Sequence, residues 1–224
     1  MAESSLQGTV GILGGSFDPV HLGHLLLAEH AREQFGLSKV CWIPAATAPY
    51  PQPKQSTRQD HRLEMVRLAT SGNSGFIVDD RELGRGGKSY TVETLEQLHK
   101  EFPAVNWVLF MGADSLNTFR LWKQPQRICQ LAHVVAVKRG GQPPPDLDSL
   151  AEFLPNPPAS PDWQARHSMI MPQIEISSTD IRARVERGQS IRYMVPPAVE
   201  AYINAHGVYR KSLLSKAEDA DRAK

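Results

Sequence analysis

Two histidines near the amino end of the chain, His21 and His24, have a type and spacing suited to phosphate chemistry. A spacing of three residues places two side chains on the same face of a helix. The segment before them, GGSFDP at residues 14–19, is a glycine-rich turn between a β-branched run and a helix, and glycines let the backbone approach a ligand closely. A helix that begins here directs free N–H groups and a positive dipole end toward an anion. Two imidazole donors aimed at one phosphate would stabilise negative charge that develops on it.

The glycine-rich turn differs from the common nucleotide-binding and metal-binding motifs. It is not GxGxxG, which disfavours a dinucleotide-binding domain, and it lacks the GK[ST] of a P-loop. The histidine spacing is not that of HExxH, and no cluster of further ligands accompanies it, so we expect no metal site built from side chains. The alternative without a function, a helix-capping histidine beside a surface histidine, does not account for the glycines.

A second polar motif, ISSTDIR at residues 176–182, begins a helix far downstream. Ser177 or Ser178 can cap this helix and Asp180 suits its first turn, so capping alone accounts for these residues. Capping does not account for Arg182, because the helix dipole disfavours a cation near a helix start. An anionic ligand at this helix start would resolve the conflict.

Short apolar runs alternate with amphipathic segments along most of the chain. The predicted strands are residues 9–13, 40–43, 76–79, 107–111 and 134–137, and residues 168–171 form a further apolar run. The predicted helices are residues 22–35, 59–69, 91–102 and 127–131, one that begins near residue 178, and 197–205. Strands separated by helices predict βαβ units. We therefore expect an α/β fold: a Rossmann-like, doubly wound parallel sheet with helices on both faces, followed by C-terminal helices that carry ISSTDIR.

Length and proline content predict the domain organisation. A chain of 224 residues matches one domain with an insertion, so we expect a single domain over residues 1–211. Residues 140–163 hold seven of the 17 prolines and predict a surface insertion. The polar residues 212–224 predict a disordered tail.

Charge and cysteine usage exclude several partners. The chain has 25 Lys and Arg against 24 Asp and Glu, so its net charge of +1 gives no general attraction for nucleic acid or an anionic membrane. It has no apolar run of about 18 residues that would cross a membrane, and it does not start like a secretory signal. Cys41 and Cys129 lie in apolar surroundings and predict buried free thiols of a reducing compartment. We expect a cytoplasmic protein, and the sequence leaves homo-oligomerisation open.

The motifs GGSFDPVHLGH and ISSTDIR together resemble those of the nucleotidyltransferase superfamily that carries the HxGH signature. Three further segments narrow the resemblance: RELGRGGKSYTVETL at 81–95, GADSL with a following tryptophan at 112–122, and VPPAVEAYINAHGVYR at 195–210. With them the chain resembles bacterial nicotinate-mononucleotide adenylyltransferases over nearly its whole length. The HxGH pair alone indicates only the superfamily.

The resemblance implies transfer of AMP from ATP to the 5′-phosphate of nicotinate mononucleotide. The products would be nicotinate adenine dinucleotide and pyrophosphate, on the route to NAD. ATP would be the co-substrate, and Mg²⁺ would bind through the ATP phosphates and water rather than a protein cage. The acceptor phosphate is largely ionised at neutral pH, so the transfer needs in-line positioning and charge neutralisation rather than a general base.

The resemblance also implies roles for individual residues. Those that contact phosphates in the catalytic step would be His21, His24 and Arg182. The nucleotide site would comprise Gly14, Gly15, Ser16, Phe17, Asp18, Gly112, Asp114, Ser177, Ser178 and Thr179. The acceptor would bind Tyr90, Thr91 and Trp122, with the Trp122 ring stacked on the pyridine. Two cations complete the substrate-binding candidates: Arg139, after the strand at 134–137, and Lys54, in the loop at 45–57.

One segment departs from the family pattern, and three alternatives stay open. Where the family commonly has PPHK, this chain has Ala48-Pro49-Tyr50-Pro51, so Lys54 is the candidate that replaces a loop cation. The acceptor could instead be nicotinamide mononucleotide, phosphopantetheine or another phosphate. A class I aminoacyl-tRNA synthetase shares a HIGH-type motif, but this chain is short and nearly neutral. A non-catalytic nucleotide sensor would keep the pocket without turnover.

Overall fold

The computed structural model describes residues 6–49, 56–139, 145–154 and 162–210. Their strands form one parallel sheet in the order β3-β2-β1-β4-β5-β6. The strands are β1 (Thr9–Gly15), β2 (Lys39–Pro44), β3 (Phe76–Val78), β4 (Asn106–Gly112), β5 (His133–Arg139) and β6 (Ser168–Met171). The order reverses between β1 and β4, as in doubly wound Rossmann-like sheets. The predicted fold class is therefore confirmed.

Each central strand divides its side chains between two cores, because successive residues of a strand point to opposite faces. Leu13, Trp42 and Phe110 lie in the first core, and Ile12 and Leu109 lie in the second. Parallel strands that are buried on both faces have near-continuous apolar sequences rather than alternating ones. This burial explains why the sequence shows these strands as short apolar runs.

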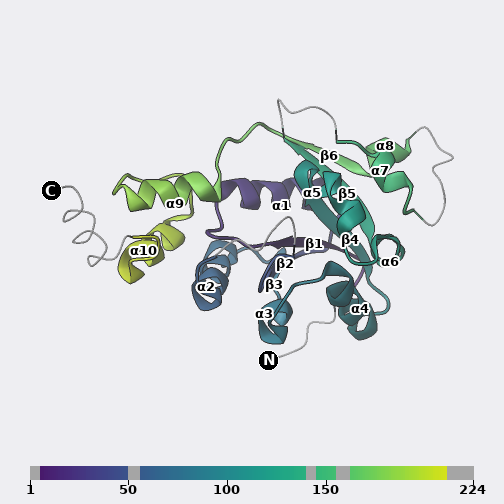
Figure 1. The fold of residues 1–224 in the computed structure, drawn as a ribbon, viewed down its shortest axis with the longest axis horizontal. Coiled ribbons are helices and arrows are strands. Elements are labelled where there is room, and N and C mark those ends of the chain that lie inside the picture. Colours follow the sequence, from purple (N-terminus) through teal and green to yellow (C-terminus); the bar gives the residue numbers. More distant parts are fainter. Residues whose placement is uncertain (1–5, 50–55, 140–144, 155–161, 211–224) are drawn as a thin grey trace.

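Helices cover both faces of the sheet (Figure 1). The first core packs against α1 (Leu22–Gln34), α2 (Gln59–Thr70), α9 (Ser178–Glu186) and α10 (Pro197–His206). The second core packs against α4 (Thr91–Glu101), α5 (Ala113–Asn117), α6 (Pro125–Leu131) and α7 (Asp148–Ala151). Three further short helical segments are α3 (Arg81–Arg85), the 3-10 helix η1 (Phe119–Leu121) and α8 (Trp163–Arg166). Because all strands of this sheet are parallel, their carboxyl ends lie together at one edge.

The proline-rich segment contributes to the core as well as to the surface. Its described part includes α7, and Leu147, the N-cap residue of that helix, and Leu150 within it are 7% and 0% exposed against the second core. The sequence predicted neither α7 nor α8, because a helix of four residues is too short to show an apolar period. The predicted tail at 212–224 lies outside the described residues.

The two cysteines are buried free thiols, as predicted. Burial raises the pKa of the Cys129 thiol to about 12, and it raises that of Cys41 further. Both thiols therefore stay protonated and act as small apolar side chains. Among the described helices, none has both the length and the apolar character to cross a membrane.

Candidate active site

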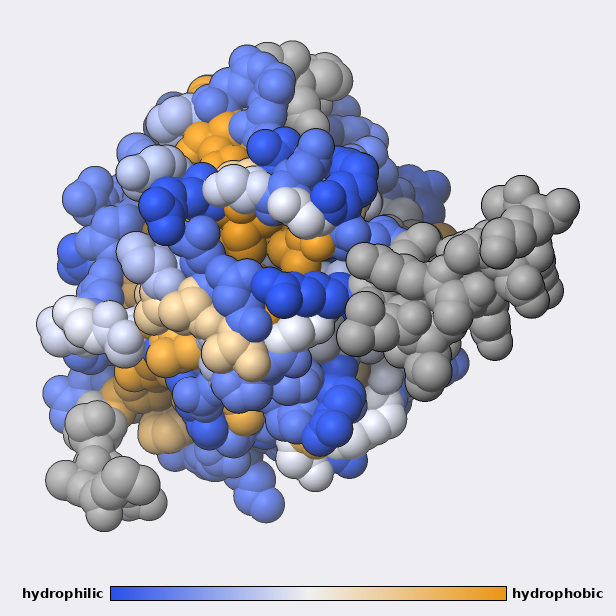
Figure 2. All heavy atoms as spheres, turned by 90° about the vertical axis from the view of Figure 1, so that its left-hand side faces the viewer, coloured by the Kyte–Doolittle hydropathy of each residue, from blue (hydrophilic) through white to orange (hydrophobic). Residues whose placement is uncertain are grey.

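A cavity of about 380 Å³ lies at the carboxyl edge of the sheet, between the ends of β1 and β4. Figure 2 faces the side of the molecule on which α9 and α10 lie in Figure 1, and it shows apolar surface in a hollow with hydrophilic surface around it. In open parallel sheets, ligands bind beyond the carboxyl ends of the strands, where the strand order reverses. The cavity occupies that position. The predicted site residues that line it are Gly14, Gly15, Ser16, His24, Tyr90, Thr91, Gly112, Asp114 and Trp122.

The turn after β1 is fixed by a buried aromatic ring. Phe17 is 2% exposed and has a φ of 46°, a left-handed backbone conformation that is uncommon for a bulky residue. Its ring centroid lies 5.2 Å from that of His24 and 5.4 Å from that of Trp42. A Cβ at Gly15 would lie 3.3 Å from the same ring, so glycine permits the close approach. The packing holds the backbone of the turn beside His24.

His21 and His24 stack on each other at the start of α1. Their ring centroids are 3.8 Å apart, and their planes are inclined by 30°. His21 is the N-cap residue and is 4% exposed, whereas His24 borders the cavity. The backbone N–H of His21 donates to Nδ1 of His24 at 3.2 Å. Because Nδ1 accepts this hydrogen bond, a neutral His24 ring carries its proton on Nε2, where it is able to donate to a ligand.

The ISSTDIR motif docks on the same turn, although 159 residues separate the two contact points in the sequence. The Ser178 hydroxyl donates to the carbonyl oxygen of Pro19 at 2.8 Å. Arg182 Nη1 donates to the carbonyl oxygen of Asp18 at 2.7 Å, and the Ser177 hydroxyl caps α9 by accepting a backbone N–H. A cation near a helix start is disfavoured by the helix dipole, and the partial negative charge of the Asp18 carbonyl offsets part of this cost for Arg182.

The Asp18 carboxylate connects the turn to the C-terminal segment, a contact that the sequence did not predict. Asp18 is 4% exposed. Its Oδ1 accepts the Tyr209 hydroxyl at 2.7 Å, and its Oδ2 accepts the Thr57 backbone N–H at 3.0 Å. Burial and the nearby Asp18 charge raise the pKa of Tyr209 far above its usual range, so the phenol stays protonated and donates. Both carboxylate oxygens thus bind groups of the protein.

Arg62 is a second positioning residue that the sequence analysis missed. It lies on α2, is 0% exposed, and donates to backbone carbonyls on both sides of the turn. Nη1 donates to Ser16 at 2.7 Å, Nη2 to Ala45 at 2.7 Å, and Nε to Thr57 at 3.1 Å. Burial lowers the pKa of the guanidinium, and the charge of Asp18 acts in the opposite direction. One side chain therefore joins the ends of β1 and β2 to the start of α2.

The opposite wall of the cavity is formed where α4 begins and where η1 ends. Tyr90 is the N-cap residue of α4, and Thr91 is its first residue. Trp122 follows η1, and its ring centroid lies 5.6 Å from that of Phe119. Lys123 Nζ lies 4.7 Å from the centroid of the Tyr90 ring. This wall presents aromatic rings beside a helix N-terminus, which suits a flat ring that carries an anionic group.

The other predicted residues do not line the cavity or are not described. Lys54 lies outside the described residues, as do Tyr50, Pro51 and the side chain of Arg139 at the end of β5. The remaining residues belong to the turn after β1, the start of α1 and α9, and none is part of the cavity lining: Phe17, Asp18, His21, Ser177, Ser178, Thr179 and Arg182. The contacts of Asp18 and Pro19 hold Ser178 and Arg182 against the turn whose residues 14–16 line the cavity.

Comparisons with known proteins agree with this geometry. The cytidylyltransferase-like family model matches residues 12–184. A Rhodopirellula baltica protein, named a probable nicotinate-nucleotide adenylyltransferase, is 46% identical over 205 residues, which cover 90% of this chain and 93% of that protein. A Roseiflexus protein of the same name is 45% identical over 202 residues, with coverages of 90% and 98%. The solved Plasmodium falciparum nicotinic acid mononucleotide adenylyltransferase complexed with NaAD has a TM-score of 0.67 at 16% identity, over 91% of this chain and 97% of that one, which supports the fold.

The sheet, the paired histidines and the family match define the class: the chain is a cytidylyltransferase-like nucleotidyltransferase. Its identity to the curated relatives extends over 90% of its length. It therefore belongs to the nicotinate-nucleotide adenylyltransferase family, as its motifs predicted.

Proposed function

We propose that this protein transfers AMP from ATP to the 5′-phosphate of nicotinate mononucleotide, on the route to NAD. The products are nicotinate adenine dinucleotide and pyrophosphate. The observation that carries the proposal is a single cavity bordered by His24 on one wall and by Tyr90, Thr91 and Trp122 on the other. The names of the curated relatives, and a solved structure that holds NaAD, support the same reaction.

The histidine wall suits the phosphates of ATP. The backbone of residues 14–16 lines the cavity and is able to approach a bound phosphate closely. The start of α1 adds the positive end of a helix dipole. We assign His21, His24 and Arg182 to these phosphates, and the hydroxyl residues of ISSTDIR to the nucleotide beside them. Arg139 and Lys54 stay predictions for a further phosphate contact.

The reaction is a displacement at the α-phosphorus of ATP. An oxygen of the acceptor phosphate forms a bond to this phosphorus, while the bond to the bridging oxygen of the departing pyrophosphate breaks. The second pKa of a phosphate monoester is about 6, so no residue needs to remove a proton from the acceptor. The protein contributes in-line alignment and donors for the charge on the phosphate oxygens. We assign the Nε2–H of His24 as the principal donor.

Magnesium fits this site as an ion that enters with ATP. Among the residues that the structure describes, no group of three or more His, Cys, Asp or Glu side chains could hold a metal ion. Both carboxylate oxygens of Asp18 already accept hydrogen bonds, from Tyr209 and Thr57. These residues suit an ion held by phosphate oxygens and water, as Mg²⁺ commonly is in nucleotide sites. When bound, such an ion neutralises charge on the departing pyrophosphate.

The aromatic wall favours nicotinate over nicotinamide. Helix α4 begins at Thr91, which lines the cavity, and the first N–H groups of a helix have no acceptor within the helix. A carboxylate near this end gains from those donors and from the helix dipole, whereas a neutral amide gains less. Trp122 stacks on the pyridine ring in this arrangement.

Pyrophosphate release tests the proposal. The purified protein is given ATP and Mg²⁺ with nicotinate mononucleotide, nicotinamide mononucleotide or phosphopantetheine in parallel reactions. We expect the highest kcat/KM with nicotinate mononucleotide. Preference for another acceptor would support nucleotidyl transfer but contradict the assignment of nicotinate mononucleotide as the substrate. No turnover with any acceptor would contradict the proposed enzymatic activity and favour a non-catalytic nucleotide sensor.

Trp122→Ala tests the acceptor wall. We expect the KM for nicotinate mononucleotide to rise at least about fivefold, because a stacked aromatic contact contributes roughly 1 kcal/mol beyond its buried area. The KM for ATP should stay unchanged. Steady-state kinetics with each substrate varied in turn give both values. An increase confined to the KM for ATP would place Trp122 in the other half of the site.

We further predict a cytoplasmic location and a single domain over residues 1–211. Limited proteolysis with mass spectrometry tests the domain boundary: the expected product retains residues 1–211 and full activity. Sedimentation of the same material determines how many copies associate.

A further inference from the structure

Two chain segments that line the cavity are joined edge to edge. One follows β2 and includes Ala46 and Thr47; the other precedes α4 and includes Lys88 and Ser89. The Ser89 N–H donates to the Thr47 carbonyl at 2.9 Å, and the Ala46 N–H donates to the Ser89 hydroxyl oxygen at 2.9 Å. Thr47 and Lys88 form a parallel β-bridge. The position of residues 90–91 relative to residues 45–49 therefore depends on Ser89.

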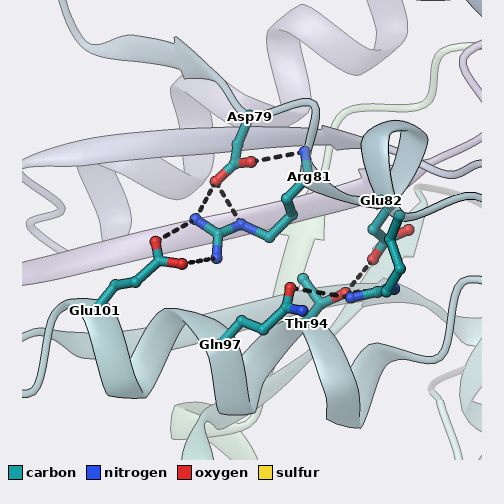
Figure 3. Close-up of polar contacts among 7 residues, drawn as sticks. Asp79, Arg81, Glu82, Thr94, Gln97 and Glu101 are labelled. Atoms are coloured by element: carbon teal, nitrogen blue, oxygen red, sulfur yellow. Dashed lines mark hydrogen bonds and ion pairs between the residues drawn. The ribbon is translucent and has the colours of Figure 1, made fainter.

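Glu82, from the short helix α3, borders the same cavity as the two joined segments. It is 7% exposed. Its Oε1 accepts the Thr94 hydroxyl at 2.6 Å, and its carboxylate also accepts a hydrogen bond from the Ser89 side chain. Figure 3 shows Thr94 of α4 directed at the Glu82 carboxylate. Burial raises the pKa of Glu82, and the hydrogen bonds from Thr94 and Ser89 act in the opposite direction.

The direction of each hydrogen bond shows that the carboxylate is the common acceptor. The Ser89 hydroxyl oxygen accepts the Ala46 N–H, and its one proton remains for the Glu82 carboxylate, whose pKa the Ser89 side chain lowers. The Thr94 hydroxyl oxygen accepts Arg85 Nη2 at 3.0 Å, so its proton is likewise given to Glu82. An amide in place of the carboxylate would turn an N–H₂ group toward one of these donors.

We propose that Glu82 is a positioning residue for the acceptor half of the site. It fixes the side chain of Ser89, which in turn holds Thr47 and the start of α4 at the spacing that the mononucleotide requires. The residues that we assign to the ATP phosphates lie on other elements: His21 and His24 at the start of α1, and Arg182 on α9. The inference rests on the proposed function, since it names a residue that serves the acceptor in that reaction.

The test is Glu82→Gln, which keeps the shape of the side chain and removes one acceptor. We expect the KM for nicotinate mononucleotide to rise about tenfold, the effect of one lost hydrogen bond to a charged group. We expect kcat and the KM for ATP to change less than about twofold, since the lost hydrogen bond serves only the acceptor wall. A general loss of folding would lower kcat or shift both KM values.

Glu101→Gln is the matched control. Glu101 is on α4 in the neighbouring network, where it binds Arg81 at 2.9 Å, and its side chain is 53% exposed (Figure 3). Arg81 keeps its second partner, Asp79, at 2.7 Å in that variant. We expect Glu101→Gln to leave both KM values unchanged.

Ser89→Ala and the double variant Glu82→Gln/Ser89→Ala complete the experiment. If the two residues act as one unit, the double variant raises the acceptor KM no further than the larger single effect. Ser89→Ala alone supplies the test if Glu82→Gln fails to fold. An unchanged acceptor KM in either single variant, or additive effects of both, would overturn the inference. Absence of turnover by the wild-type protein would instead overturn the proposed function, so the two failures are distinguishable.

Discussion

His24→Ala should lower kcat by about 10²-fold or more, the usual effect of losing one donor to charge in a transition state. The reason is geometric: the His21 N–H occupies Nδ1, so the ring presents Nε2–H to a ligand in the cavity. The acceptor KM should change little, because Tyr90 and Trp122 lie on the other wall. Steady-state pyrophosphate release at saturating ATP and nicotinate mononucleotide measures the effect.

Two further variants test whether the loss of kcat comes from the hydrogen-bond donor on the His24 side chain. His30→Ala removes a histidine from the same helix that does not line the cavity, and it should leave kcat unchanged. His24→Gln keeps an N–H donor on the side chain and should recover part of the lost rate. A near wild-type kcat for His24→Ala would show that this ring does not act on the transferring phosphate.

Arg62→Met should lower the free energy of unfolding by at least about 3 kcal/mol, because the carbonyls of Ser16, Ala45 and Thr57 would each lose a hydrogen bond from a charged donor. Methionine keeps the length and apolar stem of the side chain, so packing changes little. For a protein of this size, the loss corresponds to a decrease in Tm of about 6 to 12 °C. Thermal unfolding followed by circular dichroism measures it.

Arg67→Met is the matched control on the same helix. Arg67 pairs with Asp80 at 3.0 Å, and both side chains are more than half exposed. Because exposed ion pairs contribute only about 0 to 1 kcal/mol, its Tm should stay near that of the wild type. Equal Tm values for the two variants would show that Arg62 does not hold the turn after β1 in place.

The parallel sheet could be predicted because its central strands are buried on both faces. Residues 40–43 and 107–111 stand out as apolar runs for that reason, with helices of clear amphipathic period between them. The short helices α3 and α5 could not be predicted in the same way, because five residues span little more than one turn. Their positions depend on the strands that they contact, β2 for α3 and β4 and β5 for α5.

The two phosphate motifs could be predicted separately, but their meeting could not. Nothing in the spacing of residues 21–24 and 176–182 shows that Ser178 binds the Pro19 carbonyl. That contact depends on β6 lying at the end of the sheet, from which the chain returns to the start of α1. From the sequence, only the resemblance to a known family predicted that the two motifs form one site.

The positioning residues differ in how visible they are in the sequence. Arg62 had a signal, since it shares the buried stripe of α2 with Met65 and Val66, and a charge in an apolar stripe needs a partner. Glu82 lies in the segment 81–95 that carries the family resemblance, but its role could not be predicted, because Ser89 and Thr94 reach it only after α3 and α4 have packed together.

The most direct measurement follows a phosphorus label from ATP into product. The purified protein is incubated with nicotinate mononucleotide, Mg²⁺ and ATP labelled at either the α- or the γ-phosphorus, and the products are separated. AMP transfer predicts that the α-label appears in the dinucleotide and the γ-label appears in pyrophosphate. A γ-label in the modified mononucleotide, or an α-label that stays in ATP, would contradict nucleotidyl transfer at this site.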